Sequence, residues 1–429
     1  MKKIIKLGLL GSGTVGTGVV RVLNENKEDI VQKIGADIEI KKILVRDVNK
    51  KREYLEGIEL TDKPESILND PDIDIVVEVM GGKQPALDYM LKAMKSGKHV
   101  VTANKDVVAA HGKELFAMAE AHNTALMFEA SVGGGIPIIT PLKHCLTANK
   151  ITEIMGILNG TTNYMLTKMT QDGCDYDSIL KEAQAKGYAE ANPAADVGGL
   201  DAARKAAILA SIAFNTRVSL DDVSVEGITN IEPADIQYAT QLGYSIKLLA
   251  IARDYGEKGI NVRVHPVFLP KEHPLSNVND VFNAIFIKGN AIGEAMFYGR
   301  GAGSLPTASA VMADIVEISR NLVNDTGNLV GCTCYKELKI CPVEETEDCY
   351  YVRLRVNDES GVLGQIATAF GQCNISMKSV IQTRMVGNFA EIVAVTHITE
   401  NKKIKAALNL LQALPVVDEI SSVLRVENA

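Results

Sequence analysis

The sequence lacks two features that would suggest a membrane or a nucleic-acid partner. No uninterrupted apolar run approaches the roughly 20 residues of a membrane-spanning helix. A formal net charge of −8 over 429 residues leaves no excess of basic charge to attract a phosphate backbone or an anionic membrane. We therefore expect neither kind of partner. Hydrophobic residues make up 46% of the chain, enough to build the cores of two or three domains.

Cysteine is scarce as well. The seven cysteines are odd in number and scattered, which is typical of a protein from a reducing compartment. The chain reaches a predicted strand within a few residues of Met1, which leaves no room for a signal peptide. These observations predict a cytoplasmic protein. Four cysteines could be drawn as a metal cluster, but their spacing is not that of a common zinc site: Cys332, Cys334, Cys341 and Cys349.

The most informative pattern is the glycine-rich turn Gly11-x-Gly13-x-x-Gly16. Apolar residues at 4–10 predict a buried strand before it, and the helical spacing of residues 14–33 predicts an amphipathic helix after it. In this context the glycines fit a dinucleotide-binding fingerprint, in which they permit a tight turn, a close approach to pyrophosphate and close packing of helix on strand. The alternative is a structural glycine turn in some other α/β protein. The predicted cofactor contacts are Leu10, Gly11, Gly13, Thr14, Val15 and Gly16.

Residues 1–130 alternate short apolar strands with helical patterns, which predicts a doubly wound parallel sheet of the Rossmann type. The predicted strands are 4–10, 38–45, 73–79, 99–102 and 125–129, and the predicted helices are 14–33, 64–68, 85–95 and 112–121. Ligands of such sheets bind at the carboxyl ends of the strands. A later helix at about 304–322, which follows a glycine loop and carries Pro306 near its start, is expected to return to this domain.

The end of the second predicted strand bears on the choice of cofactor. An NAD-specific domain usually places an acidic residue there to bind the ribose 2′-hydroxyl. Here the position is Arg46, followed by Asp47, with Lys50 close by. Because a guanidinium matches a 2′-phosphate, the pattern favours NADP(H), while Asp47 leaves NAD(H) open. The alternative interpretation is a solvated basic turn.

The rest of the chain predicts two further domains, which makes the whole an α/β protein of mixed architecture. Residues 131–303 predict an α+β substrate-binding and dimerisation domain with its own sheet. Residues 323–349 have the composition of a linker. Residues 350–429 follow the order βαββαβ of a ferredoxin-like unit.

A second cluster of chemically useful residues lies at 187–205. Glu190 and Asp196 fall in a predicted loop, and Asp201 opens a helix on which Lys205 lies four residues further, on the same face. Three carboxylates and a lysine around a glycine turn suit a small zwitterionic substrate. The alternative, a surface ion pair beside a solvated loop, is at least as common for such a composition.

Four segments together resemble homoserine dehydrogenase over nearly the whole chain. They are the fingerprint at 11–16, Thr102-Ala103-Asn104-Lys105, Asn159-Gly160-Thr161-Thr162 and the run Gly-Leu-Asp-x-x-Arg-Lys at 199–205. The turn Asp358-x-x-Gly361-Val362-Leu363-Gly364 resembles the ACT domain that ends many of these enzymes. No aspartate-kinase segment precedes the fingerprint, so the resemblance is to the monofunctional type. It implies NAD(P)-dependent interconversion of L-homoserine and L-aspartate 4-semialdehyde, in threonine and methionine biosynthesis.

The resemblance also implies roles for the charged residues. Lys205 would exchange a proton with the substrate oxygen. Lys105 would lie beside the nicotinamide and the substrate as a second candidate for that transfer. Glu190 would bind the substrate ammonium group, and Asp196 and Asp201 would bind substrate or orient Lys205. Since lysine is ordinarily protonated at neutral pH, we expect homoserine oxidation to run best at alkaline pH.

Further residues are implied by the same resemblance. Gly160 and Thr161 would line the substrate pocket, and Gly303 would contact the cofactor. A sodium-binding loop, for which carboxylate and main-chain carbonyl oxygens are suitable ligands, would comprise Glu129, Val132, Gly134 and Ile136. The ACT unit implies L-threonine as an effector and a homodimer or homotetramer, although the unit could also serve only for oligomerisation.

Two other functions remain to be weighed. An acyl-phosphate reductase would need a cysteine nucleophile activated by histidine, for which His144-Cys145 is the nearest candidate, but adjacent side chains tend to point apart. A nucleotide-sensing regulator with an amino-acid-binding tail is the non-enzymatic alternative. The acidic chain and the lack of a basic DNA-reading helix weigh against a DNA-binding version of it.

Overall fold

The computed structural model describes residues 4–327, 330–387 and 389–427. The chain divides into two compact units. Unit 1 comprises Met1–Ile154, Arg204–Val223 and Phe282–Glu337, and unit 2 comprises Met155–Ala203, Ser224–Val281 and Leu338–Ala429. The division falls within β7 (Ile151–Ile157), α9 (Leu200–Ala213) and β8 (Val223–Val225).

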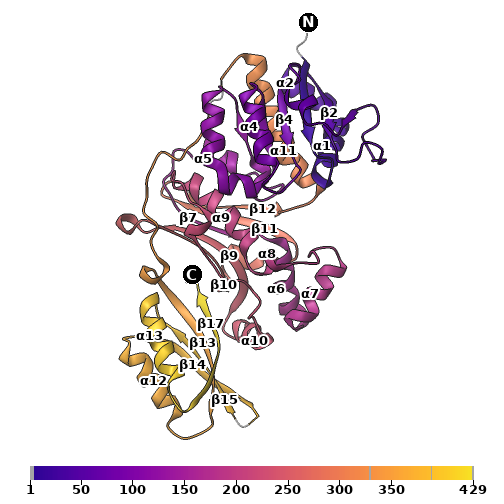
Figure 1. Ribbon diagram of the computed structural model, residues 1–429. Helices are drawn as coiled ribbons and strands as arrows, with labels where there is room; N and C mark the ends of the chain where they lie inside the picture. The colour runs from indigo at the N-terminus through magenta and orange to yellow at the C-terminus, as the bar shows by residue number, and fades with distance from the viewer. Residues whose placement is uncertain (1–3, 328–329, 388, 428–429) are drawn as a thin grey trace. The chain divides into compact units, whose positions relative to one another are not determined.

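A six-stranded parallel sheet forms the centre of unit 1, which confirms the predicted Rossmann-type fold (Figure 1). Its strands are β1 (Ile4–Leu10), β2 (Asp37–Leu44), β3 (Glu59–Thr61), β4 (Ile75–Glu78), β5 (His99–Thr102) and β6 (Leu126–Met127). The spatial order is β3-β2-β1-β4-β5-β6, so the direction of strand addition reverses between β1 and β4. This reversal is the topological switch point at which such sheets bind nucleotides.

Helices cover both faces of this sheet (Figure 1). One face carries α1 (Thr14–Glu25), α2 (Lys27–Ile34) and α11 (Ser304–Asn324), and the other carries α3 (Glu65–Leu68), α4 (Ala86–Lys95) and α5 (Lys105–Ala121). Apolar side chains of α11 join those of β1 and α1 in one buried core, so a helix from late in the sequence completes the first domain. It follows the antiparallel hairpin of β11 (Phe282–Gly289) and β12 (Gly293–Arg300).

Two helix predictions for this unit are wrong in detail. The single helix predicted at 14–33 is two helices, because the chain leaves helical geometry at Asn26 (φ −116°, ψ 18°). Asparagine is a poor helix former that competes for backbone hydrogen bonds, although the amphipathic pattern continues past it. Helix α5 begins at Lys105 rather than 112, since the Asn104 side chain caps it by accepting the Val107 N–H.

Unit 2 contains a mixed sheet in the order β9-β10-β17-β13-β15-β14. These strands are β9 (Tyr244–Asp254), β10 (Ile260–Pro270), β13 (Glu347–Asn357), β14 (Met377–Val386), β15 (Phe389–Thr396) and β17 (Val417–Val426), with the short β16 (Thr399–Glu400) beside β13. The helices of unit 2 are α6 (Gly160–Asp172), α7 (Tyr176–Ala185), α8 (Ala194–Val197), α10 (Pro233–Gln241), α12 (Val362–Gln372) and α13 (Asn401–Gln412).

The C-terminal tail has the predicted ferredoxin-like order, and α12 and α13 pack on one face of its strands around a buried apolar core (Figure 1). Its last strand, β17, pairs in parallel with β10 through Val267 and Phe268. The tail therefore continues the sheet to which β9 and β10 belong.

A buried ionic cluster also ties the tail to the rest of unit 2. The Arg353 guanidinium on β13 bonds Asp235 (2.9 Å) and Glu391 (3.1 Å), and all three side chains are at most 6% exposed. Glu232 at the start of α10 adds a third carboxylate at 2.7 Å. Because buried charges are stable only when paired, this cluster fixes how α10 packs on β13.

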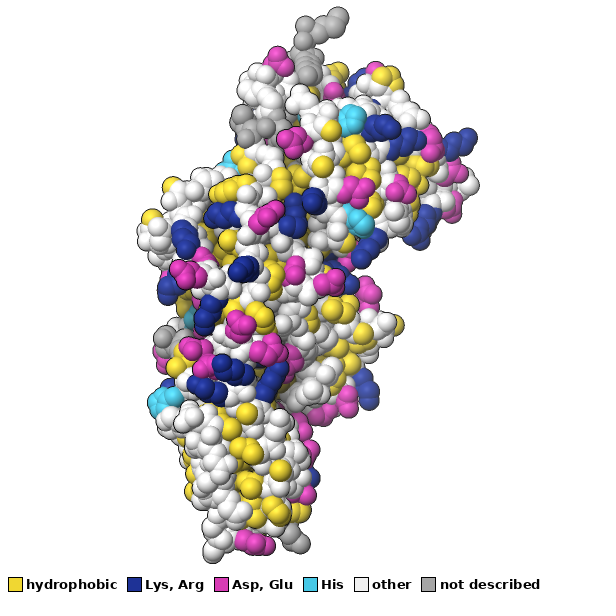
Figure 2. Space-filling view, turned by 60° about the vertical axis from the view of Figure 1, so that its left-hand side comes forward, with side chains coloured by type: hydrophobic (Ala, Val, Ile, Leu, Met, Phe, Trp, Pro, Cys, Tyr) yellow, Lys and Arg dark blue, Asp and Glu magenta, His cyan; other side chains and the backbone are white. Residues whose placement is uncertain are grey.

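The surface carries charges of both signs. On the face shown in Figure 2, basic and acidic side chains are interspersed, without a continuous basic stripe. Across the described ranges, no helix combines the length and the apolar character needed to cross a membrane.

Candidate active site

The fingerprint turn has the geometry that its glycines predict. Gly11 adopts φ +108°, a conformation that favours glycine. A Cβ on Gly16 would lie 2.3 Å from the Gly11 carbonyl oxygen, so only glycine lets α1 pack this closely against the turn. A Cβ on Gly13 would meet nothing within 4 Å, so the space beside it is open to a ligand. Gly13 precedes Thr14 and Val15, whose N–H groups open α1.

A cleft extends from this turn to the ends of β2 and β4, and Arg46 and Lys50 lie exposed along it. Asp47 also lines the cleft, but one of its carboxylate oxygens accepts the Asn49 N–H (2.9 Å) within a local turn. Arg52 donates to the carbonyls of Asp47 and Lys50 (both 2.8 Å) and so holds this basic loop in shape. Leu10 is fully buried at the end of β1, directly before the turn.

Two residues hold the neighbouring loops in place: Glu78, which the sequence did not single out, and Asn104, which lay within a quoted motif. The fully buried Glu78 ends β4, and its carboxylate accepts the Met80 N–H (2.8 Å) and the Thr102 hydroxyl (2.7 Å). Asn104 donates to the Gly82 carbonyl (2.7 Å) while it caps α5. The loops after β4 and β5 are thereby joined. Lys105 is consequently fixed as the first residue of α5.

The glycine loop before α11 lies against the same region. The Ser304 hydroxyl donates to the Thr14 carbonyl (2.7 Å), and a Cβ on Gly18 would collide with the Ser304 carbonyl at 2.6 Å. Gly303, at φ +126°, immediately precedes this contact. The structure therefore places Gly303 beside the fingerprint helix.

The two segments that carry the candidate lysines are joined within unit 1. Arg204 of α9 forms an ion pair with Asp106 of α5 at 2.9 Å. Lys205 follows Arg204 in the chain and Lys105 precedes Asp106, so the pair joins the two lysine-bearing segments. Lys205 is only 9% exposed.

In unit 2, Asn159 joins two of the predicted carboxylates. Its amide nitrogen donates to Asp196 (2.8 Å) and to Asp201 (2.9 Å), while its amide oxygen accepts the Thr162 N–H (2.9 Å) and caps α6. Asn159 and Asp201 are 6% and 7% exposed. Asp201 lies near the start of α9, one helical turn before Lys205 along the same helix.

The remaining predicted substrate residues lie nearby in unit 2. Gly160 opens α6, and a Cβ there would lie 2.8 Å from the Val281 carbonyl oxygen. The Thr161 hydroxyl donates to the Tyr188 carbonyl (2.6 Å), which ties α6 to the loop that carries Glu190. Glu190 is exposed on that loop, and its own carbonyl accepts the Gln184 amide (3.1 Å).

The predicted cation loop is well ordered by hydrogen bonds. The buried Glu129 carboxylate accepts the N–H groups of Ile138 (2.6 Å), Ile139 (2.8 Å) and Thr140 (2.7 Å). These three donors engage both oxygens of the carboxylate, so Glu129 holds the backbone at 138–140 in place. A Cβ on Gly134 would lie 2.4 Å from the Gly301 carbonyl oxygen, so this loop packs tightly on the 299–303 loop.

Asp314 lies behind this loop and accepts the Glu129 N–H (2.9 Å). Complete burial, reinforced by repulsion from Glu129, raises the pKa of Asp314 well above its usual range. This burial disfavours the charged form of Asp314 beside the predicted cation loop.

The structure supports neither a catalytic His144-Cys145 pair nor a metal cluster of cysteines. His144 lies 3.6 Å from Glu317, and the adjacent Cys145 is exposed on the same short helical segment, Pro141–Cys145. Within the part of the chain that the structure describes, no three histidine, cysteine or acidic side chains form a metal-binding group. None of the seven cysteines, all of which lie in the described ranges, forms a disulfide.

Comparisons with known proteins match the nucleotide-binding region, the middle region and the tail of this chain. Residues 11–129 match the family "Homoserine dehydrogenase, NAD binding domain", residues 137–316 match "Homoserine dehydrogenase", and residues 350–416 match "ACT domain". The chain is 45% identical to homoserine dehydrogenase of Bacillus subtilis over 99% of both chains. It is 46% identical to that of Corynebacterium glutamicum over 99% of this chain and 96% of the relative.

Solved structures agree with these matches. A homoserine dehydrogenase from Thiobacillus denitrificans superimposes with a TM-score of 0.95 at 42% identity, covering 99% of each chain. A hyperthermophilic archaeal homoserine dehydrogenase in complex with NADPH superimposes with a TM-score of 0.64 at 26% identity, covering 76% of this chain and 100% of that one.

Proposed function

Because the chain belongs to the homoserine dehydrogenase family, we propose that it interconverts L-homoserine and L-aspartate 4-semialdehyde with a nicotinamide cofactor, in threonine and methionine biosynthesis. The observation that carries this proposal is the pair of carboxylates, Asp196 and Asp201, that Asn159 holds beside the start of α9. The same helix carries Lys205. Acceptors for an ammonium and a hydroxyl group, followed by a proton donor, are what a hydroxy-amino acid substrate requires.

The residues divide the chemical work as follows. The bound cofactor supplies or accepts the hydride. In the reducing direction negative charge develops on the aldehyde oxygen, and Lys205 stabilises that charge and then protonates it. Lys105, fixed at the start of α5, is the second donor of positive charge. Glu190 binds the substrate ammonium group from its exposed loop, while Asp196 and Asp201 orient the substrate and Lys205.

Substrate recognition provides a direct test of these roles. The rate of NADP⁺ reduction would be measured with L-homoserine and with 4-hydroxybutanoate, which lacks the ammonium group. A site built to pair a charged group rejects the analogue that lacks it, so kcat/KM should fall by roughly 10⁴-fold. Comparable values of kcat/KM for the two alcohols would contradict the assignment of the carboxylates to the ammonium group.

We further propose a preference for NADP(H) over NAD(H). The exposed Arg46 and Lys50 on the nucleotide cleft support it, and the archaeal relative was solved with NADPH. A charge-assisted bond to a phosphate contributes about 1.5–3 kcal/mol, so Arg46→Ala should lower the NADPH/NADH ratio of kcat/KM by about 10- to 150-fold. Asp47→Asn, the matched control, should not lower that ratio. An unchanged ratio in Arg46→Ala would exclude the predicted contact.

The tail supports a proposal about regulation. We assign L-threonine as its effector and a homodimer or homotetramer as the assembly, on the strength of the ACT match. Since β17 pairs with β10, deletion of the tail would expose a strand edge of unit 2, and the full-length chain is the better test. Inhibition of turnover by L-threonine but not by D-threonine is expected, with the mass of the assembly measured by light scattering. Equal effects of the two enantiomers would refute the assignment.

Two lesser assignments complete the proposal. The main-chain carbonyls of residues 129–136 bind a sodium ion that orders the loop, and the fixed Glu129 carboxylate supports this loop geometry. Replacing sodium by choline at constant ionic strength should lower the melting temperature. Retention of the full melting temperature would argue against the site. A cytoplasmic location remains the prediction of the sequence.

A further inference from the structure

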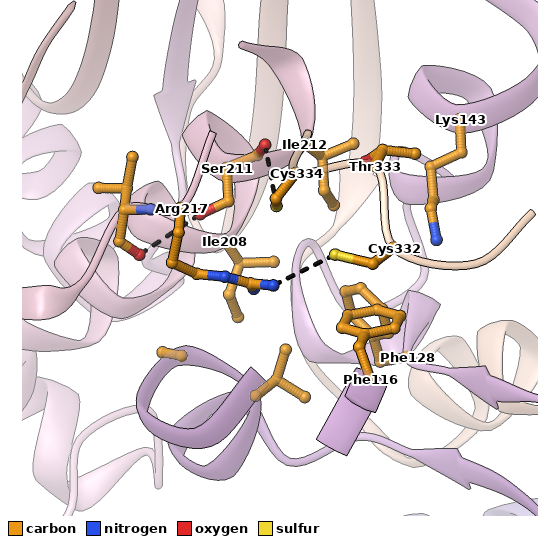
Figure 3. Close-up of a pocket in the computed structure, with 13 residues that line it drawn as sticks. Phe116, Phe128, Lys143, Ile208, Ser211, Ile212, Arg217, Cys332, Thr333 and Cys334 are labelled. Atoms are coloured by element: carbon orange, nitrogen blue, oxygen red, sulfur yellow. Dashed lines mark hydrogen bonds between the residues drawn. The ribbon is translucent and has the colours of Figure 1, made fainter. Parts of the chain in front are cut away.

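Two cysteines that the proposed reaction does not use line a pocket of unit 1 (Figure 3). Cys332 and Cys334 come from the segment that follows α11, and they lie against residues of α5 and α9. Cys332 is exposed and Cys334 is half-buried, so both are open to small reagents. The pocket also contains two cationic side chains, Arg217 and Lys143.

The two cations lie around the Cys332 sulfur. The Arg217 guanidinium donates to Cys332 Sγ at 3.2 Å (Figure 3). Arg217 reaches this position across Gly112 of α5, where a Cβ would lie 2.9 Å from the guanidinium. Lys143 Nζ lies 5.4 Å from the ring centre of Phe116 and 5.6 Å from that of Phe128, on the other side of the pocket. The chain thus places two cations and two aromatic rings beside one thiol.

These contacts favour the thiolate form of Cys332. The side-chain hydrogen bond from Cys334 lowers the pKa of Cys332 to about 5, and the charges of Arg217 and Lys143 add to this effect. Burial lowers the pKa of Lys143, while the negative charge of Cys332 opposes that change. Lys143 also faces Glu317 and Asp314 of α11, and burial raises the pKa of Asp314.

Cys334 has the opposite character. Its sulfur lies 3.6 Å from the Ser211 carbonyl oxygen of α9 (Figure 3). The hydrogen bond to Cys332 and burial raise the pKa of Cys334 above its ordinary value, so it keeps its proton. A thiolate and a protonated thiol two residues apart are the two partners that thiol–disulfide exchange requires.

We propose that Cys332 and Cys334 form a thiol–disulfide exchange site for anionic low-molecular-weight disulfides, with Cys332 as the attacking thiolate. The thiolate attacks one sulfur of the disulfide, forms a mixed disulfide and releases one thiolate. Cys334 then loses its proton to solvent and attacks Cys332 Sγ, which forms the Cys332–Cys334 bond and releases the second thiolate. The two cysteines lose two electrons in total and the low-molecular-weight disulfide gains them. Arg217 and Lys143 attract carboxylate groups of the reagent.

The reactivity of single thiols tests the first step. The native, fully reduced chain would be labelled with iodoacetamide at pH 6, and each cysteine would be quantified by mass spectrometry. An ordinary thiol is less than about 1% ionised at that pH, so Cys332 should react at least tenfold faster than Cys145, the exposed control on the same unit. Equal rates at the two cysteines would overturn the proposal.

The second step is tested with oxidised glutathione. The wild-type chain should yield an intramolecular Cys332–Cys334 disulfide, and Cys334→Ser should stop at a glutathione adduct on Cys332. Arg217→Gln should slow adduct formation at least tenfold. Absence of the intramolecular disulfide from the wild-type chain would overturn the proposal even if Cys332 reacts quickly with iodoacetamide.

Discussion

Replacement of Asn159 should show how much this side chain contributes to catalysis and how much to the stability of α6. Its amide nitrogen donates to both Asp196 and Asp201, and its amide oxygen caps α6. Asn159→Ala removes all of these bonds. Each bond to a carboxylate contributes about 1.5–3 kcal/mol, and the loss of even one in the transition state would lower kcat/KM for L-homoserine by about 10- to 150-fold. The lost cap would also reduce the free energy of unfolding by about 1 kcal/mol.

Asn159→Asp is the matched control for this experiment. An aspartate at 159 keeps an oxygen that can accept the Thr162 N–H, but it removes the shared donor and places a third carboxylate beside Asp196 and Asp201. Steady-state assays should therefore find that Asn159→Asp loses at least as much kcat/KM as Asn159→Ala. Wild-type kcat/KM in Asn159→Asp would refute the idea that the shared donor organises the carboxylates and would leave the cap as the main role.

Two further predictions concern the stability of unit 2. Asp235→Ala leaves the buried Arg353 without its closest fully buried partner and should reduce the free energy of unfolding by about 3–5 kcal/mol. Asp418→Ala is the control, because it removes only the ion pair with the partly exposed Arg355. It should reduce the free energy of unfolding by at most about 1 kcal/mol. Urea denaturation of both variants checks this, and equal losses would contradict the buried cluster. Burial lowers the pKa of Lys247 to about 8, so the unfolded chain binds more protons than the folded chain between pH 8 and about pH 10.4. The stability of the wild type relative to Lys247→Met should therefore rise with pH across that interval, and a difference that stays constant would refute the shift.

The parts of the fold that follow from local pattern could be predicted from the sequence. Strand β1 was predicted with its observed bounds, Ile4–Leu10, because its apolar run, the glycine turn and the helical spacing after it are all local signals. The three-residue β3 was missed because it is too short to show a period. The first half of strand β17 pairs with β13 without a strict apolar alternation, so local pattern does not mark where this strand begins.

The candidate site likewise contains residues that local motifs reveal and contacts that they do not. The glycines, Arg46, Asp196, Asp201 and Lys205 were visible as motifs. Asn159 lay within a quoted motif, but its bridge to the carboxylates joins residues 37 and 42 positions apart, and no local pattern encodes such a contact.

Glu129 was named at a predicted site, but the structure shows its side chain bonded to the backbone of its own loop. It was predicted as a residue of a sodium-binding loop, and its carboxylate bonds N–H groups that follow it by nine to eleven residues. A side chain at a predicted site can therefore support the loop rather than bind the ligand directly. Only the folded geometry distinguishes these two roles.

The proposed reaction is hydride transfer between NADPH and L-aspartate 4-semialdehyde, with Lys205 supplying the proton. The most direct test is NADPH consumption in the presence of that aldehyde, measured for the wild type and for Lys205→Met. We expect turnover by the wild type and a kcat at least about a hundredfold lower in Lys205→Met, with little change in KM, because the lysine acts in the transition state. No consumption of NADPH or NADH by the wild type, or an unchanged kcat in Lys205→Met, would contradict the proposal.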